Sequence, residues 1–142
     1  MTWPLFAVAL VLGIAALSDL LRLRIPNACT LALVLLLPAA GPPWTDHLLG
    51  GAAGLAFGLL GFAMGWFGGG DAKLLAGVAL WCGVKRFPTL IMAVGLIGGG
   101  LAIVVLAARR CRLGHRLGLP TLEQDAPLPY GLAIAAGAWW VM

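Results

Sequence analysis

The chain carries little charge, and so it lacks the polar surface that a water-soluble protein needs. Of its 142 residues only 10% are charged and 62% are hydrophobic, and the mean hydropathy is +1.04. Such a composition cannot coat a soluble globule, so it excludes that class and predicts an integral membrane protein. The apolar residues are gathered in helix-length runs, and we expect an all-α polytopic fold.

Reactive side chains are also scarce. The three cysteines, Cys29, Cys82 and Cys111, form no C-x-x-C pair, and the two histidines, His47 and His115, fall in separate connections. This spacing argues against a zinc site and leaves Cys29 and Cys82 as core residues. The motifs of serine hydrolases, zinc peptidases and P-loop nucleotide-binding proteins are missing from the sequence, so those chemistries lack their residues. We expect no metal and no cofactor.

The positive net charge of the chain is explained by contact with the membrane. The net charge is +4, with nine Lys and Arg residues. These cations cluster at the ends of apolar runs, where they anchor and orient helices. We therefore expect membrane lipid as a partner and no nucleic acid.

Six apolar runs predict the spans: residues 3–18, 26–40, 48–67, 72–84, 88–108 and 130–142. A span needs about 20 residues, so the third and fifth runs are long enough, whereas the second, fourth and sixth are short. A version with four spans is the alternative, and we favour six. We expect the first run to be a retained helix, and residues 1–142 to form one intramembrane domain.

The positions of the cations predict the orientation. With the N-terminus outside and six crossings, only Lys85 and Arg86 face outward. The other seven cations then face the cytosol: Arg22, Arg24, Lys73, Arg109, Arg110, Arg112 and Arg116. This asymmetry follows the positive-inside rule. The same threading puts Asp19 and Asp71 at the cytosolic ends of their helices, and it separates His47 from His115.

Two of the five acids stand where a membrane protein should avoid them. Asp19 ends the first apolar run, and Asp71 lies between the third and fourth runs. A carboxylate at membrane depth costs about 2.5 to 3.5 kcal/mol and usually marks an ion path, a proton relay or a catalytic centre. Asp46, Glu123 and Asp125 lie in polar or proline-containing connections and need no such explanation. Two acids brought together from different helices would form a dyad.

The residues before Asp71 strengthen this hypothesis. Gly68, Gly69 and Gly70 can adopt positive φ, and they carry no side chain that would block a substrate from the acid. We expect Asp71 to begin the fourth helix, where the helix dipole favours a carboxylate. Helix capping is the structural alternative, but capping alone does not require three glycines.

Two cations that flank the acids, Lys73 and Arg24, have two possible roles each. Lys73 lies on a different helix face from Asp71, and it is either an interfacial anchor or a contact to an acidic group of a substrate. Arg24 is either an anchor or a charge that tunes an acid or contacts the substrate. Pro26 is favourable at the start of the second helix and makes a tight re-entry that holds Asp19 near it.

Glycine is frequent, with 21 residues. Gly50, Gly54 and Gly58 recur every four residues and predict a smooth helix-packing stripe on the third helix. The glycines of the fifth helix, at positions 95 and 98–100, are expected either to face that stripe or to form a flexible point.

Three elements occur in order along the chain: Asp19 with Ile25-Pro26-Asn27, then GGGDAKLLAGVALW over residues 68–81, then PYGLAIA over residues 129–135. In this order and topology they resemble the type IV prepilin peptidases, which are GxGD-type intramembrane aspartyl proteases. The likeness is greatest to the small tight-adherence (Flp pilus) branch. It spans nearly the whole chain.

The resemblance implies that Asp19 and Asp71 are catalytic. Around them we expect active-site or substrate-binding residues at Gly68, Gly70, Lys73, Arg24, Pro26 and Asn27. The implied activity removes a short basic leader from prepilin or pseudopilin substrates, after a glycine and just before their hydrophobic helix, at the cytosolic side of the bacterial inner membrane. Larger members also carry a loop with paired cysteines and N-methylate the new N-terminus. This chain lacks that loop, so methyltransferase activity is not implied.

Two carboxyl groups can hydrolyse a peptide bond without a metal ion or a nucleotide. Two carboxyls that share a site do not both ionise easily, so one holds a proton while the other activates water. Two other classes remain open: a small proton-coupled transporter or channel subunit that uses Asp19 and Asp71 as a relay, and a structural scaffold subunit. Against the transporter, both acids map to one membrane face and the helices show no inverted repeat.

Overall fold

The computed structural model describes residues 3–41, 43–66, 68–110, 126 and 128–142, which form helices and turns without a strand. The helices are α1 (Trp3–Arg22), α2 (Asn27–Leu36), α3 (Trp44–Ala63), α4 (Gly69–Cys82), α5 (Phe87–Arg110) and α7 (Tyr130–Val141), with short 3-10 helices η1 (Leu37–Ala40) and η2 (Val84–Arg86). The prediction of an all-α membrane protein is confirmed.

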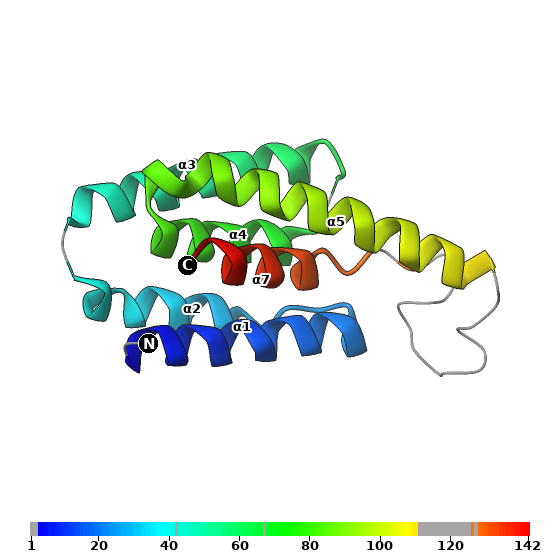
Figure 1. The fold of residues 1–142 in the computed structure, drawn as a ribbon, viewed down its shortest axis with the longest axis horizontal. Helices are drawn as coiled ribbons and strands as arrows, with labels where there is room; N and C mark the ends of the chain where they lie inside the picture. Colours follow the sequence, from blue (N-terminus) through cyan, green and yellow to red (C-terminus); the bar gives the residue numbers. More distant parts are fainter. Residues whose placement is uncertain (1–2, 42, 67, 111–125, 127) are drawn as a thin grey trace.

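Successive helices run in opposite directions along one bundle, and the two termini lie at the same end (Figure 1). At the other end α1 finishes and α2, α4 and α7 begin. Asp19 and Asp71 belong to these helix ends, and we call this part of the molecule the Asp end. Arg22, Arg24 and Lys73 also belong to it, whereas Lys85 and Arg86 lie in η2 at the opposite end. Arg112 and Arg116 lie outside the described residues.

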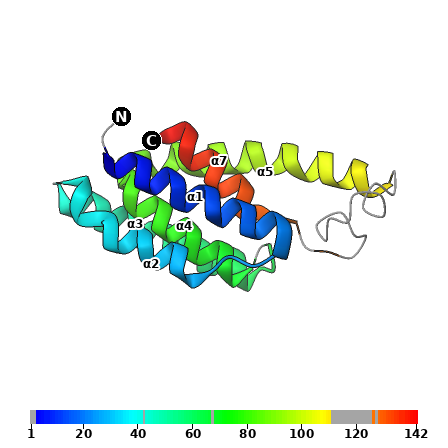
Figure 2. The same cartoon turned by 90° about the horizontal axis from the view of Figure 1, so that it is seen from below.

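The helices differ in length according to their place in the bundle. Three segments are long and apolar enough to cross a membrane: Trp3–Arg22, Trp44–Ala63 and Val84–Arg110. Helix α4 has only 14 residues, about 21 Å at 1.5 Å per residue. It lies in the middle, in contact with α2, α3 and α7 (Figure 2). Nine of its 14 residues are buried, because it is covered by helices on several sides.

The glycine stripe of α3 packs against α4. A Cβ atom at Gly50 would lie 2.5 Å from the carbonyl oxygen of Ala79, and one at Gly54 would lie 2.5 Å from the Ala79 Cβ. At Gly58 it would lie 2.9 Å from the carbonyl oxygen of Ala72. Real Cβ atoms do not approach this closely, so only glycine allows this spacing. The packing role of the stripe therefore agrees with the prediction.

The glycines of α5 do not face that stripe, so this one of the two alternatives was wrong, while the flexible point stays a prediction. Gly98 packs at ordinary contact distance on Ala133 and Tyr130 of α7. Around Gly95, Gly99 and Gly100, no described residue beyond the neighbouring backbone of α5 has a heavy atom within 4 Å of the place where a Cβ would stand. Helix α4 occupies the α3 stripe, so α5 is left to pack mainly on α7.

Several helix boundaries differ from the apolar runs. Helix α1 continues to Arg22, and α3 already begins at Trp44. Asp46 therefore lies in the first turn of α3 and not in a connection, in a position that the helix dipole favours. His47 also lies within α3, where its Nδ1 is 2.9 Å from the carbonyl oxygen of Leu80. His115, Glu123 and Asp125 lie outside the described residues.

The end of α3 is set by Gly65, which adopts a φ of +72°. This left-handed conformation ends a helix and suits glycine. Trp66 therefore leaves the helix, although the apolar run had predicted that the helix continues to residue 67.

Candidate active site

Asp19 is held at the turn that joins α1 to α2. Its side chain is 6% exposed. Leu23, the residue after α1, has a φ of +51°, and its N–H donates to the Asp19 carbonyl oxygen at 2.8 Å. The hydroxyl of Ser18 donates to the Arg24 carbonyl oxygen, also at 2.8 Å. These two bonds fold the chain back immediately after Asp19, so the acid lies beside the start of α2.

Asp71 is the third residue of α4, and the prediction that it begins the helix is off by two residues. The N–H of Gly68 donates to its Oδ2 at 3.0 Å, so this oxygen does cap the helix. Its Oδ1 is buried and, among the described residues, has no hydrogen-bond partner. An unpaired buried polar group costs about 1–3 kcal/mol. Helix capping therefore accounts for the position of Oδ2, but it does not account for a buried Oδ1 without a partner.

None of the three glycines before Asp71 adopts the positive φ that the sequence suggested for them. Gly68 is extended, with φ −76° and ψ 162°, and the described glycines with positive φ are Gly41, Gly65 and Gly83. A Cβ at Gly68 would lie 3.4 Å from the Asp71 Oδ2, which is an ordinary contact distance. A side chain at this position would stand beside the acid, so the expected role of Gly68 in substrate access stays a prediction. Gly70 instead lies against the α1–α2 turn, with its Cβ position 3.4 Å from the Cβ of Ile25.

Helix α7 supplies a third element of the site. The N–H of Gly131, in its first turn, donates to the Asp19 Oδ2 at 2.8 Å in a buried contact. A Cβ at Gly131 would lie 2.8 Å from that same oxygen and 2.8 Å from the Cδ1 of Ile25. Gly131 therefore has to be glycine for Asp19 to occupy its place. A negative charge on Asp19 is also favoured here, because the N-terminus of α7 presents its free N–H groups.

Asp19 and Asp71 border one cavity of about 340 Å³, which we call the Asp cavity. Its other lining residues are Leu23, Gly65, Trp66, Gly68, Leu128 and Tyr130. The two carboxyl groups are close enough to interact electrostatically, and the backbone of Gly131 lies near both. The turn after α1, the start of α4 and the start of α7 thus bring two buried acids to a single opening.

The remaining candidates lie around this cavity and not on its lining. Pro26 precedes α2 in an extended conformation, with φ −62° and ψ 132°. The ammonium group of Lys73 donates to the Oδ1 of Asn27 at 3.4 Å in an exposed contact, which joins the start of α4 to the start of α2. Arg24 is exposed, and only its carbonyl oxygen has a described role, as acceptor for Ser18.

Sequence reasoning missed Gly131, Ile25, Trp66 and Tyr130 as site residues. Ile25 and the Pro129-Tyr130-Gly131 segment were part of the family likeness, but nothing local indicated that Gly131 touches Asp19. No group of three or more His, Cys, Asp or Glu side chains in the described part of the chain is placed to hold a metal ion.

The sequence model of the type IV leader peptidase family matches residues 6–103. The matched part contains Asp19, Asp71 and the glycines before Asp71, whereas the start of α7 lies beyond it. No curated protein and no solved structure matches the chain significantly. With more than half of its length matched, the chain belongs to the type IV leader peptidase family, which is a family of proteases.

Proposed function

We propose that the chain is an intramembrane aspartyl endopeptidase that removes the short basic leader from prepilin or pseudopilin substrates, with Asp19 and Asp71 as its catalytic dyad. One observation carries the proposal: two buried carboxyl groups from different helices border the same cavity. Membership of a leader peptidase family supplies the reaction type. We further propose that residues 1–142 form one peptidase domain of the tight-adherence branch.

The mechanism follows from two carboxyls at one opening. One carboxylate takes a proton from a water molecule as that water attacks the carbonyl carbon of the scissile peptide bond. The other carboxyl, which is protonated, donates a hydrogen bond to the carbonyl oxygen and stabilises the tetrahedral intermediate. The C–N bond then breaks, and the departing amine receives the proton taken from water. The products are a leader with a new carboxylate and a mature chain with a new amino terminus.

The surrounding backbone positions the pair. Gly131 and Gly68 each donate an N–H to one carboxyl oxygen, which fixes the orientation of both side chains. The free Oδ1 of Asp71 is then available for the shared proton, the water or the substrate. The proton belongs to the coupled pair, so the two acids act as a unit.

The charge distribution supports a cytosolic active site in the bacterial inner membrane. Arg22, Arg24 and Lys73 belong to the Asp end, and Lys85 and Arg86 to the opposite end. By the positive-inside rule the Asp end faces the cytosol and the N-terminus lies outside. A reporter fused after Arg110 should be cytosolic and one fused after Lys85 periplasmic. The reverse result would contradict this orientation.

The test of the proposed function is cleavage by the purified protein. In detergent, the chain should release a leader fragment from a prepilin-like substrate, and N-terminal sequencing of the product should identify the bond after glycine. Asp71→Asn should release none. Asp46→Asn is the matched control, because Asp46 is an acid in the first turn of α3, far from the Asp end, and this variant should cleave normally.

The same assay decides between the functional classes. A transporter or scaffold subunit would release no leader fragment, so a folded wild-type protein without cleavage would refute the peptidase. Cleavage that persists in Asp71→Asn would remove this residue from the mechanism.

A further inference from the structure

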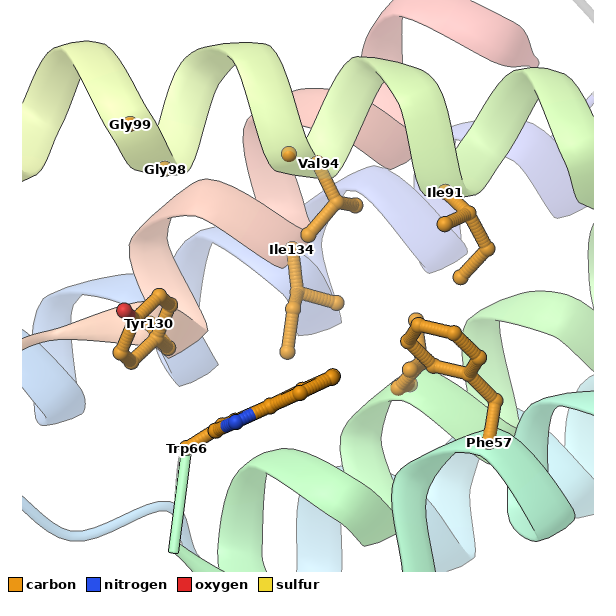
Figure 3. A pocket seen from close by; sticks show the side chains of 10 residues that line it. Phe57, Trp66, Ile91, Val94, Gly98, Gly99, Tyr130 and Ile134 are labelled. Atoms are coloured by element: carbon orange, nitrogen blue, oxygen red, sulfur yellow. The ribbon is translucent and has the colours of Figure 1, made fainter. Parts of the chain in front are cut away.

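A second cavity lies beside the Asp cavity, between α5 on one side and α3 and α4 on the other. It has a volume of about 320 Å³, and we call it the apolar groove. In Figure 3 the side chains of Phe57 from α3, Ile91 from α5 and Ile134 from α7 point toward a common space, with Trp66 across its floor and Tyr130 at one side. Its volume is in the range of about 300–1,000 Å³ that is typical of ligand sites.

The apolar groove continues from the Asp cavity. Trp66 and Tyr130 line both, so the two cavities share a wall. The Asp cavity holds the two acids, whereas the residues that line only the groove are aliphatic, aromatic or glycine. A bound chain that passes Trp66 and Tyr130 would therefore leave a polar site and enter an apolar one.

The α5 side of the groove is smooth, and no other described segment packs on its two glycines. Gly95 and Gly99 line it, and outside the α5 backbone neither has a heavy atom of a described residue within 4 Å of the place for a Cβ. The contrast is Gly54 on α3, where a Cβ would lie 2.5 Å from Ala79 of α4. The stripe on α3 already has its partner helix within the chain, and the α5 surface is open. Both α5 glycines are exposed, so the groove opens to the side of the bundle.

We propose that the apolar groove binds the hydrophobic helix of the substrate, the segment that follows the scissile bond. This inference rests on the proposed function. Small residues let two helix backbones approach closely in lipid, and an apolar helix in a groove is a common mode of peptide recognition. The order of the two cavities matches the order of the substrate: the peptide bond lies at the acids, and the apolar helix continues past Trp66 and Tyr130 along α5.

Filling the groove tests the proposal. In Gly95→Leu and Gly99→Leu a side chain occupies the space of the incoming helix. We expect kcat/KM to fall by about 5- to 140-fold, which corresponds to about 1–3 kcal/mol of overpacking at about 1.4 kcal/mol per tenfold. The loss is expected for a full-length substrate, through KM, and not for a truncated peptide that ends a few residues after the scissile bond. Gly100→Leu is the matched control, because Gly100 is also open but does not line the groove.

The outcomes separate this inference from the proposed function. Equal losses on the long and the short substrate, or an equal loss in Gly100→Leu, would overturn the groove and leave the peptidase standing. A wild-type protein that cleaves neither substrate would refute the peptidase and the groove together.

Photo-crosslinking tests the contact without relying on turnover. In an Asp71→Asn background, p-benzoylphenylalanine at position 91, on the groove, should crosslink to the hydrophobic helix of the substrate. The same group at position 96 is the control, since Leu96 is 74% exposed and lies off the groove. Equal crosslinking at both positions, or crosslinks at position 91 only to lipid or to a second copy of the chain, would contradict the proposal.

Discussion

The substitution Gly131→Ala adds one methyl group at the point where α7 meets Asp19. Its Cβ would stand 2.8 Å from the Asp19 Oδ2, whereas ordinary contacts begin at 3.4 Å. The carboxyl group or the start of α7 must therefore move by about half an ångström, and either movement disturbs the hydrogen bond from the Gly131 N–H. A displacement of about 1 Å at a reacting group can cost about 100-fold in rate. We expect kcat to fall by about 10- to 100-fold.

Stability should change much less than activity. Alanine is favoured over glycine in a helix by about 1 kcal/mol, which offsets part of the cost of the clash. The assay is leader release by purified protein, measured beside the melting temperature in detergent. Gly100→Ala is the control, because in the described part of the chain no heavy atom outside the α5 backbone lies within 4 Å of that Cβ position, and it should cleave like the wild type. A Gly131→Ala protein with wild-type kcat would show that Asp19 does not need its present position.

The remaining predictions concern packing and the rim of the site. Gly54→Leu should lower the melting temperature, because its Cβ would stand 2.5 Å from Ala79 and overpacking costs about 1–3 kcal/mol. Gly13→Leu should not lower it, because no described residue outside the α1 backbone has a heavy atom within 4 Å of that Cβ position. Equal effects of the two substitutions would reject the argument. Trp81→Phe should cost about 1 kcal/mol, because the Trp81 Nε1–H donates to the Leu33 carbonyl oxygen at 2.8 Å in the core; an unchanged unfolding free energy would contradict it. Lys73→Met should weaken processing more for a substrate with an acid near the scissile bond than for one without it, and equal weakening would leave Lys73 as an anchor.

Much of the architecture was predictable, because the helices of a membrane protein appear in its sequence as long apolar runs. The apolar runs predicted six helices, and the cations predicted which helix ends share one side. The same threading predicted that Asp19 and Asp71 belong to one end, and the structure places both on one cavity. The catalytic roles of these two acids remain a prediction that the cleavage assays test.

The parts that could not be predicted depend on distances between elements. Gly54 and Gly95 look alike in sequence, yet α4 fills the surface beside one and leaves the other open. Gly131 is one glycine among many, and its importance follows only from the 2.8 Å approach of Asp19. Trp66 belongs to an apolar run, and its place between two cavities results from the positive φ of Gly65 just before it. Local patterns specify helices, but they do not specify which surfaces remain uncovered.

The most direct test of the central claim compares Asp19→Asn, Asp71→Asn and the double variant in the leader-release assay, at equal amounts of folded protein. When two residues act as one catalytic unit, the rate losses of the single variants do not add in the double variant. The account predicts that each single variant falls to the same background rate as the double variant. A single variant that still releases leader above that background, or losses that add in the double variant, would contradict a shared dyad.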